Sequence, residues 1–269
     1  MPTRNQVVAL ALCIVVLVVI YQVRYWANYL LGRRNHRGMH DLVGKMKHTH
    51  ITRRRVPRHL RDRMLVFKLN EHHPKVVKAT VLPAIMDAIK KHQHPKFPTV
   101  DCHVVDYLTT KSPYAFSAHT DTEWNSLSND GYQVWYLISN KNTENLGNMF
   151  IIDCPYLFDK YSKNNIFYTL AKENDDVVVS VNRPPLLPRP GCARELERIP
   201  VGWFVANTTV YYLDFEPGDC LVFDRGLCHM SDTRDRQRYA VNFRVLVGEP
   251  RKRDKDCGFL ANTGVAYKT

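Results

Sequence analysis

The chain has 269 residues, which is enough to enclose a sizeable hydrophobic core. Hydrophobic residues make up 45% and charged residues 24% of the sequence, close to globular averages, and these values exclude a largely disordered chain. The formal net charge of +12 resides in residues 1–68, which contain 14 Lys or Arg and two acids, whereas the remaining 24 basic and 24 acidic residues cancel. Only the N-terminal segment is therefore expected to attract a polyanion or an anionic membrane.

The chain begins with an apolar stretch. Residues 7–21 form an uncharged run of 15 residues, somewhat shorter than the roughly 20 that cross a bilayer as a helix. The aromatic residues that follow, Tyr25, Trp26 and Tyr29, are of the kind enriched at membrane interfaces. No small-residue cleavage site follows the run. The sequence predicts an uncleaved transmembrane anchor in residues 1–31, with a cleaved signal peptide and a buried helix as the alternatives.

Residues 32–68 are predicted to be a basic juxtamembrane linker. Only Arg4 precedes the apolar run, whereas several Lys and Arg follow it closely, so the positive-inside rule places the rest of the chain in the cytosol. An anionic membrane surface is the expected partner of the linker, and nucleic acid is a possible one. The seven cysteines are odd in number and include no C-x-x-C pair, which indicates neither a disulfide framework nor a zinc ribbon.

Residues 69–269 are expected to form the folded domain. Apolar residues recur at helical spacing over 76–91, where Pro83 should kink or restart the helix. Short runs rich in Val, Ile, Tyr and Phe follow, and no long helical pattern alternates with them. This pattern argues against parallel βαβ units and predicts a mainly β domain, a sandwich or jelly roll, with a core at about 99–248 behind an N-terminal helical layer. The expected strands are 99–109, 131–139, 148–153, 176–181, 209–215, 220–223 and 238–247.

The first chemical motif is His119-Thr120-Asp121, the sole His-x-Asp in the sequence. On a strand, residues i and i+2 point to the same face, so this imidazole and carboxylate can share one metal ion. Two histidines and one carboxylate are the ligand set of non-haem iron oxygenases. Taken alone the pair is weak, because about one such match is expected by chance among 12 histidines.

A second motif supplies the missing histidine. Residues 216–231 contain a Pro-Gly turn, a short apolar strand and then His229. The next strand carries Arg238, nine residues later, with Asn242 and Arg244 on the same expected face. A dicarboxylate needs a fixed cation at its far end, and the arginine fork suits that role, so either arginine is a candidate, with Arg238 favoured.

In this order and texture, residues 100–248 resemble the Fe(II)/2-oxoglutarate-dependent oxygenases, especially the phytanoyl-CoA dioxygenase-like branch. The resemblance implies a double-stranded β-helix (jelly roll). It also implies that His119, Asp121 and His229 bind Fe(II), and that Arg238 and Ser231 bind 2-oxoglutarate. Within the strand 133–138, Trp135 matches a family tryptophan that approaches the cosubstrate.

Tyr107 lies on the expected strand before the His-x-Asp motif and is a further candidate contact of the cosubstrate, with a plain core tyrosine as the alternative. Likewise, His229 is alternatively a buried core histidine, and Asp121 a turn or helix-capping residue.

The expected activity is that of a dioxygenase that uses Fe(II), O₂ and 2-oxoglutarate to hydroxylate an unknown small-molecule or lipid-like substrate, releasing succinate and CO₂. Three other readings remain open at this point. One is a non-catalytic, membrane-bound jelly-roll adaptor. Another is an oxygenase acting on nucleic acid or protein and guided by the basic segment. The third is a metal-dependent cupin or isomerase, against which Arg238 argues.

Overall fold

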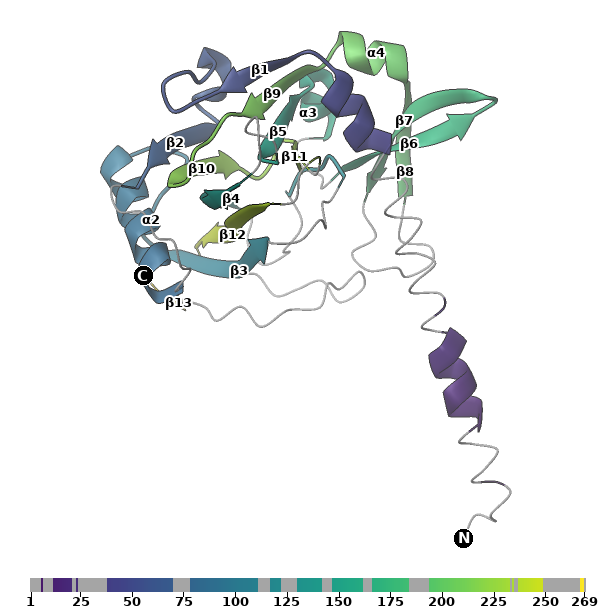
Figure 1. Cartoon of the computed structure of the whole chain (residues 1–269), viewed down its shortest axis with the longest axis horizontal. Helices are drawn as coiled ribbons and strands as arrows, with labels where there is room; N and C mark the ends of the chain where they lie inside the picture. The colour runs from purple at the N-terminus through teal and green to yellow at the C-terminus, as the bar shows by residue number, and fades with distance from the viewer. Residues whose placement is uncertain are drawn as a thin grey trace.

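A computed structural model of the chain describes residues 6, 12–20, 23, 38–69, 78–110, 117–121, 130–141, 147–161, 166–183, 194–232, 234, 237–248 and 267–268. The described residues are mainly β structure with few helices (Figure 1). The helices are η1 (Arg58–Leu60), α2 (Lys78–His92), α3 (Pro155–Tyr161) and α4 (Val201–Ala206), and residues 38–45 are also helical. The strands are β1 (His48–Ile51), β2 (Met64–Lys68), β3 (Cys102–Thr110), β4 (Asp130–Asn140), β5 (Met149–Asp153), β6 (Phe167–Glu173), β7 (Asp176–Arg183), β8 (Arg194–Pro200), β9 (Thr209–Leu213), β10 (Asp219–Asp224), β11 (His229–Ser231), β12 (Arg238–Val247) and β13 (Tyr267–Lys268).

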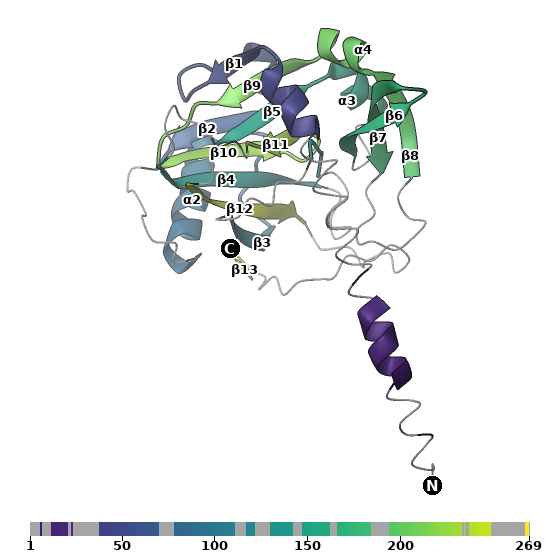
Figure 2. The ribbon, with the colours of Figure 1, turned by 45° about the vertical axis from the view of Figure 1, so that its right-hand side comes forward.

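Two sheets face each other across the core (Figures 1 and 2). The larger has six strands in the order β13-β3-β12-β4-β10-β2, and the smaller has four in the order β1-β9-β5-β11. A third sheet, β6-β7-β8, lies beside the smaller one. Among the described strand pairs all are antiparallel except β1 with β9. The expectation of a mainly β, antiparallel domain is therefore confirmed.

Alternation along each strand divides the apolar residues between layers. On β4, Trp135 and Leu137 point into the space between the two sheets, whereas Val134 and Tyr136 pack on the outer face against α2. On β5, Ile151 points inward, and Phe150 and Ile152 pack outward in a cluster that includes residues of the helical segment 38–45. The space between the two sheets contains the inward-facing side chains, and the apolar clusters on the outer faces separate it from water.

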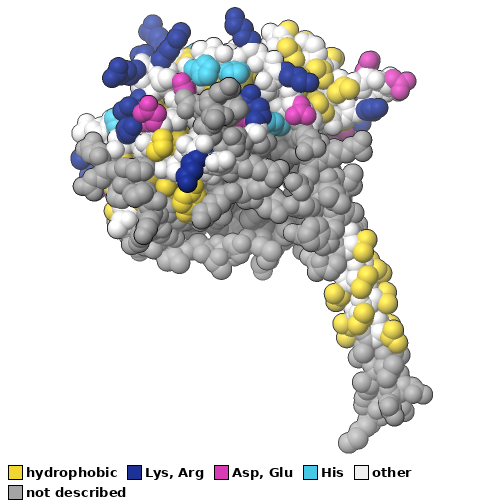
Figure 3. Space-filling view, in the orientation of Figure 1, with side chains coloured by type: hydrophobic (Ala, Val, Ile, Leu, Met, Phe, Trp, Pro, Cys, Tyr) yellow, Lys and Arg dark blue, Asp and Glu magenta, His cyan; other side chains and the backbone are white. Residues whose placement is uncertain are grey.

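Residues 38–68, assigned from composition to a basic linker, are part of this fold. Strand β1 pairs with β9 and β2 pairs with β10, so the segment contributes to both sheets. Its apolar residues are buried: Met39 and Val43 are 0% exposed, although basic residues surround them in the sequence. Most of its basic side chains are exposed, and Figure 3 shows dark blue side chains in the region of β1. Within 38–68 exposed basic residues thus alternate with buried apolar ones, and composition alone does not reveal that the segment is folded.

The predicted single-pass membrane localisation is wrong for the part of the chain that the structure describes. Within that part, no helix combines the length and the apolar character needed to cross a membrane. The described helical run 12–20 extends about 14 Å at 1.5 Å per residue, roughly half of a hydrocarbon core of about 30 Å. The other residues predicted for the anchor, apart from 6 and 23, lie outside the described residues.

Candidate metal centre

His119 and His229 lie directly opposite each other in an antiparallel bridge. The His119 amide donates to the His229 carbonyl over 3.0 Å, and the His229 amide donates back to the His119 carbonyl over 2.9 Å. Residues paired in this way carry their side chains on the same face. The imidazole centroids are accordingly 4.4 Å apart. Two segments separated by more than a hundred residues thus bring two nitrogen ligands together.

Asp121 completes the group from the position two residues after His119. Its Oδ1 lies 3.8 Å from Nε2 of His119, and its Oδ2 lies 3.4 Å from Nε2 of His229. One ligand atom from each residue lies within 4.8 Å of the other two, and all three side chains are buried. The structure therefore places the predicted metal ligands around one centre, in the two-histidine, one-carboxylate arrangement of non-haem iron oxygenases.

Backbone carbonyls set the orientation of both imidazoles. Nδ1 of His119 lies 2.7 Å from the Ser117 carbonyl, and Nδ1 of His229 lies 3.0 Å from the Leu227 carbonyl. Because a carbonyl can only accept, each Nδ1 carries the proton and donates it, which leaves the Nε2 lone pair directed at the centre. Burial lowers the pKa of both histidines, that of His119 to about 3 with a further contribution from His229. Both rings are therefore neutral at pH 7, the form that binds a metal ion.

Arg244 holds the carboxylate of Asp121 in its ionised form. Burial raises the pKa of Asp121, but the opposing interactions, chiefly the positive charge of Arg244, hold the pKa below its usual value. Nη2 of Arg244 lies 3.1 Å from Oδ1 of Asp121. Arg225 also donates from Nε to the Asp121 carbonyl over 3.1 Å, which fixes the backbone there. Arg244, the second candidate anchor for the cosubstrate, thus contacts the carboxylate of the candidate metal centre.

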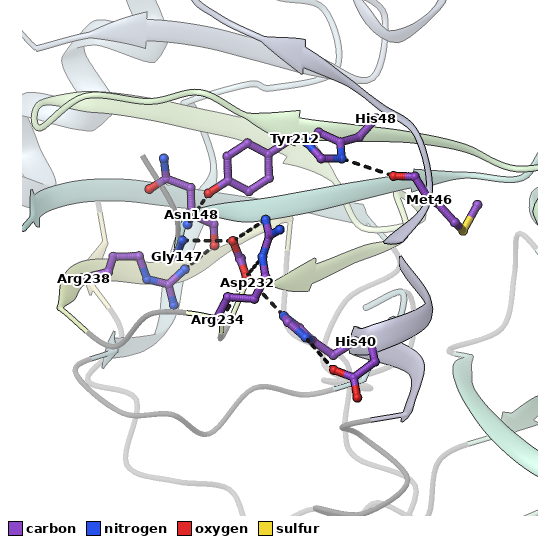
Figure 4. Close-up of polar contacts among 10 residues, drawn as sticks. His40, Met46, His48, Gly147, Asn148, Tyr212, Asp232, Arg234 and Arg238 are labelled. Carbon is purple, nitrogen blue, oxygen red and sulfur yellow. Dashed lines mark hydrogen bonds and ion pairs between the residues drawn. The ribbon is translucent and has the colours of Figure 1, made fainter. Parts of the chain in front are cut away.

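Arg238 is a buried cation at the start of β12, 9% exposed. Its Nη1 donates to the Asn148 carbonyl (Figure 4). Its guanidinium carbon lies 5.7 Å from the ring centroid of Trp135. Within the described residues no carboxylate forms an ion pair with it. Burial lowers its pKa to about 10, against the opposing effect of Asp232, so it remains charged at neutral pH. A buried guanidinium with unused donors is suited to an anionic ligand.

Trp135 lies close to Arg238, and Ser231 lies on a strand next to the backbone that Arg238 contacts. Ser231 pairs with Met149, the residue after Asn148, whose carbonyl receives the Arg238 hydrogen bond. Trp135 is buried on the inner face of β4. Tyr107 belongs to β3 by its backbone, but its side chain lies outside the described residues.

Asp232 links His40, Gly147 and Arg234, a role not predicted from the sequence. It accepts hydrogen bonds from His40 Nε2 (3.2 Å), the Gly147 amide (3.0 Å), and both the amide and guanidinium of Arg234 (3.0 Å) (Figure 4). Burial raises the pKa of Asp232, but the hydrogen bonds from His40, Arg234 and Gly147 outweigh it and hold the pKa well below its usual value. His40 lies 192 positions away in the sequence, so only the folded chain reveals the contact.

Replacing Asp232 with asparagine should lower the free energy of unfolding by about 3 kcal/mol at pH 7. The substitution removes the negative charge of the carboxylate that contacts both the buried His40 and the partly exposed Arg234. Urea denaturation measures this loss. Because the pKa of Asp232 is lower in the folded than in the unfolded chain, where it is about 4, its ionised carboxylate stabilises the fold above about pH 4. This stabilisation is lost as the pH falls, so the difference in unfolding free energy between wild type and variant should shrink below about pH 4. The control is Asp153→Asn, whose partner His59 is 56% exposed, with an expected change within about 1 kcal/mol. Equal losses in both variants would contradict the structural role of Asp232.

No known protein family profile matches the sequence, and no curated protein matches it. Among solved structures, the chain is similar to one titled "non-heme monooxygenase; ThoJ apo", with 15% identity and a TM-score of 0.32, over 61% of this chain and 52% of that one. It is also similar to "Non-heme monooxygenase, ThoJ-Ni complex", with 13% identity and a TM-score of 0.30, over 65% of this chain and 63% of that one. The chain thus spans between half and two thirds of these proteins, and its function has to be derived from its own residues.

Proposed function

We propose that this chain is a non-haem Fe(II) oxygenase that consumes 2-oxoglutarate and O₂ and hydroxylates an organic substrate. The buried convergence of His119, Asp121 and His229 carries the proposal. Two neutral imidazoles and one carboxylate fit Fe(II), and three ligands on one face leave coordination positions for a cosubstrate and O₂. Iron bound there would supply the activation of O₂ for attack on a C–H bond.

Neighbouring residues orient the three proposed metal ligands. Ser117 and Leu227 direct the two imidazoles through their carbonyls, and Arg244 keeps Asp121 ionised. Phe167 stacks on His119 with ring centroids 5.1 Å apart, and Phe223 lies 4.8 Å from the His229 ring. These contacts exclude water from the outer sides of the ligands and hold their rotamers.

Arg238 supports the assignment of 2-oxoglutarate as the cosubstrate. A buried guanidinium without a carboxylate partner among the described residues can bind the distal carboxylate of a dicarboxylic acid. Ser231 pairs with Met149, next to Asn148, and would add a hydrogen bond from its hydroxyl, and Trp135 would form a flat wall beside the cosubstrate. A cupin or isomerase that lacks this cosubstrate would have no use for a buried cation at this position.

The order of strands supports a jelly roll. In the larger sheet β3, β12, β4 and β10 are neighbours, and in the smaller one β11, β5 and β9 are neighbours, with 117–121 joined to β11 through His119. Most consecutive segments along the chain alternate between the two sheets, and the exception is β5 followed by β9. These seven strands and the bridged segment 117–121, alternating between two facing sheets, match the pattern of an eight-stranded double-stranded β-helix.

Anaerobic addition of Fe(II) and 2-oxoglutarate to the full chain should produce a weak visible charge-transfer band. Exposure to O₂ should then yield succinate even without the primary substrate, because many such centres turn over slowly when uncoupled. Absorption spectroscopy and succinate quantification measure the two effects. Fe(II) alone and 2-oxoglutarate alone serve as controls. If the band and succinate are both absent, the 2-oxoglutarate assignment fails.

A further inference from the structure

Two amide side chains near the candidate metal centre, the buried Gln133 and the partly buried Asn242, have buried hydrogen-bonding atoms without a partner. Gln133 on β4 is 0% exposed, and in the described structure neither its Nε2 nor its Oε1 has a partner. Oδ1 of Asn242, on the neighbouring strand β12, is also buried without one. Buried polar atoms in folded proteins are almost always paired, so these three atoms indicate a partner that binds from outside the chain.

The register of the larger sheet places Gln133 beside the metal ligands. Gln133 pairs with Phe223 on one side and with Arg244 on the other. Phe223 contacts the ring of His229, and Arg244 forms the ion pair with Asp121. Gln133 thus lies in a row of inward-facing side chains whose two flanking members both touch the ligand group.

Asn242 belongs to the next row of the same inner face. It pairs with Trp135, which lies two residues after Gln133 and points to the same side. Asn242 and Arg244 are only partly buried, so solvent reaches this part of the inner face. Gln133 and Asn242, termed the amide pair below, therefore face the same space as the candidate metal centre.

The fold satisfies a buried amide where that amide has a structural role. Asn148 is also 0% exposed, but its Nδ2 donates to the carbonyls of Leu213 (3.0 Å) and Phe215 (3.2 Å), and its Oδ1 accepts from Asn140 over 3.2 Å. By contrast, Gln133 has no such bonds, although an apolar residue at its position would avoid burying unpaired polar atoms. This difference indicates that Gln133 serves a ligand.

The chemistry of the unused atoms limits what that ligand can be. The two oxygens need hydrogen-bond donors, and Nε2 of Gln133 needs an acceptor. The dianion of 2-oxoglutarate can only accept, so it cannot satisfy the oxygens. An ammonium can only donate, and the neighbouring Arg244 disfavours a second cation. A neutral carboxamide both donates and accepts, and its NH₂ group offers two donors for the two oxygens.

We infer that the amide pair recognises a neutral carboxamide group on the primary substrate and thereby positions an adjacent C–H bond at the metal centre. This inference rests on the proposed function for the reaction, but the binding itself does not depend on turnover. Gln133 is the main recognition residue because both of its polar atoms are unused. Asn242 supplies the second acceptor.

The binding test follows the side-chain amide NMR signals of the full chain, with Zn(II) as a diamagnetic substitute for iron and with 2-oxoglutarate present. The signal that disappears in Gln133→Met identifies Gln133. Acetamide should shift this signal in a saturable manner, and Asn242→Leu should weaken the response. Acetate, which only accepts, and methylammonium, which only donates, should leave it unchanged. No response to acetamide, or an equal response to acetate, would overturn the inference.

A stability test separates ligand recognition from a structural role. Gln133→Met should raise the melting temperature of the ligand-free protein by about 2 °C, because it removes unpaired buried polar atoms. The matched control is Asn148→Leu, which breaks satisfied hydrogen bonds and should lower the melting temperature. A loss in Gln133→Met as large as that of Asn148→Leu would show that Gln133 is structural. The iron charge-transfer band reports on the proposed function independently, so a response to acetamide without that band would overturn the oxygenase assignment alone.

Discussion

Replacing His119 with alanine should abolish 2-oxoglutarate-dependent succinate formation and eliminate the Fe(II) charge-transfer band. The substitution removes one of three ligand atoms that lie within 4.8 Å of one another. Changing only the residues that orient metal ligands commonly costs 10–100-fold in affinity, so loss of a ligand itself should cost at least about a hundredfold. Fe(II) titration under anaerobic conditions and succinate assays measure the effect.

His119 is a better target than Asp121 because its removal should leave the fold intact. The bridge between residues 119 and 229 is made by backbone atoms, which alanine retains. Removing the Asp121 carboxylate would instead break the ion pair with the partly buried Arg244 and lower stability by about 3–5 kcal/mol. The control is His59→Ala, which removes a mostly exposed histidine on the surface and should retain full activity. Activity of His119→Ala equal to that of wild type would exclude the proposed iron centre.

Part of the site follows directly from strand periodicity. His119 and Asp121 share a face because they are two residues apart, and Arg238, Asn242 and Arg244 share another for the same reason. Periodicity does not reveal that His119 pairs with His229. This pairing is made by β11, and a strand of three residues is too short to show a period. The resemblance to an oxygenase family supplied that pairing, and the geometry agrees with it.

Several strands were missed because local composition favours another state. Strand β8 has the sequence RELERIP, and β6 contains Leu-Ala-Lys-Glu, both rich in residues that favour helices. Pairing with β7 overrides that preference, as expected when tertiary contacts decide the state of a strand. Strands β1 and β2 were missed because basic residues around them concealed a few buried apolar positions.

The roles of the two arginines could not be separated by sequence, since both occupy inward-facing positions of one strand. The structure distinguishes them by partner: Arg244 meets Asp121, whereas Arg238 meets Trp135 and the Asn148 carbonyl. Gln133 did carry a signal, because a lone amide at an inward position of an apolar strand is unusual. The sequence does not show that both polar atoms of the Gln133 side chain lack a partner, which is the observation that points to a ligand.

Replacing Arg238 with glutamine should raise the concentration of 2-oxoglutarate needed for half-maximal succinate formation by about a hundredfold, while Fe(II) affinity stays near the wild-type value. Loss of one partner from a buried, charge-assisted interaction costs about 2–5 kcal/mol, and the lower part of that range already corresponds to this factor. The guanidinium is available for the cosubstrate because, among the described residues, it has a carbonyl and an aromatic ring as partners but no carboxylate. Titration of the charge-transfer band with 2-oxoglutarate measures the change.

Two further variants make the result specific. Arg198→Gln removes one positive charge from an exposed ion pair and should leave the 2-oxoglutarate requirement unchanged. Arg244→Gln should mainly affect the metal: it removes the ion-pair partner of Asp121 and should weaken Fe(II) binding more than 2-oxoglutarate binding. If Arg244→Gln instead raised the 2-oxoglutarate requirement and Arg238→Gln did not, the two arginines would have exchanged roles, and the cosubstrate would lie along the opposite end of β12. The separation of the two effects, metal affinity from one arginine and cosubstrate affinity from the other, is what the contacts of each guanidinium require.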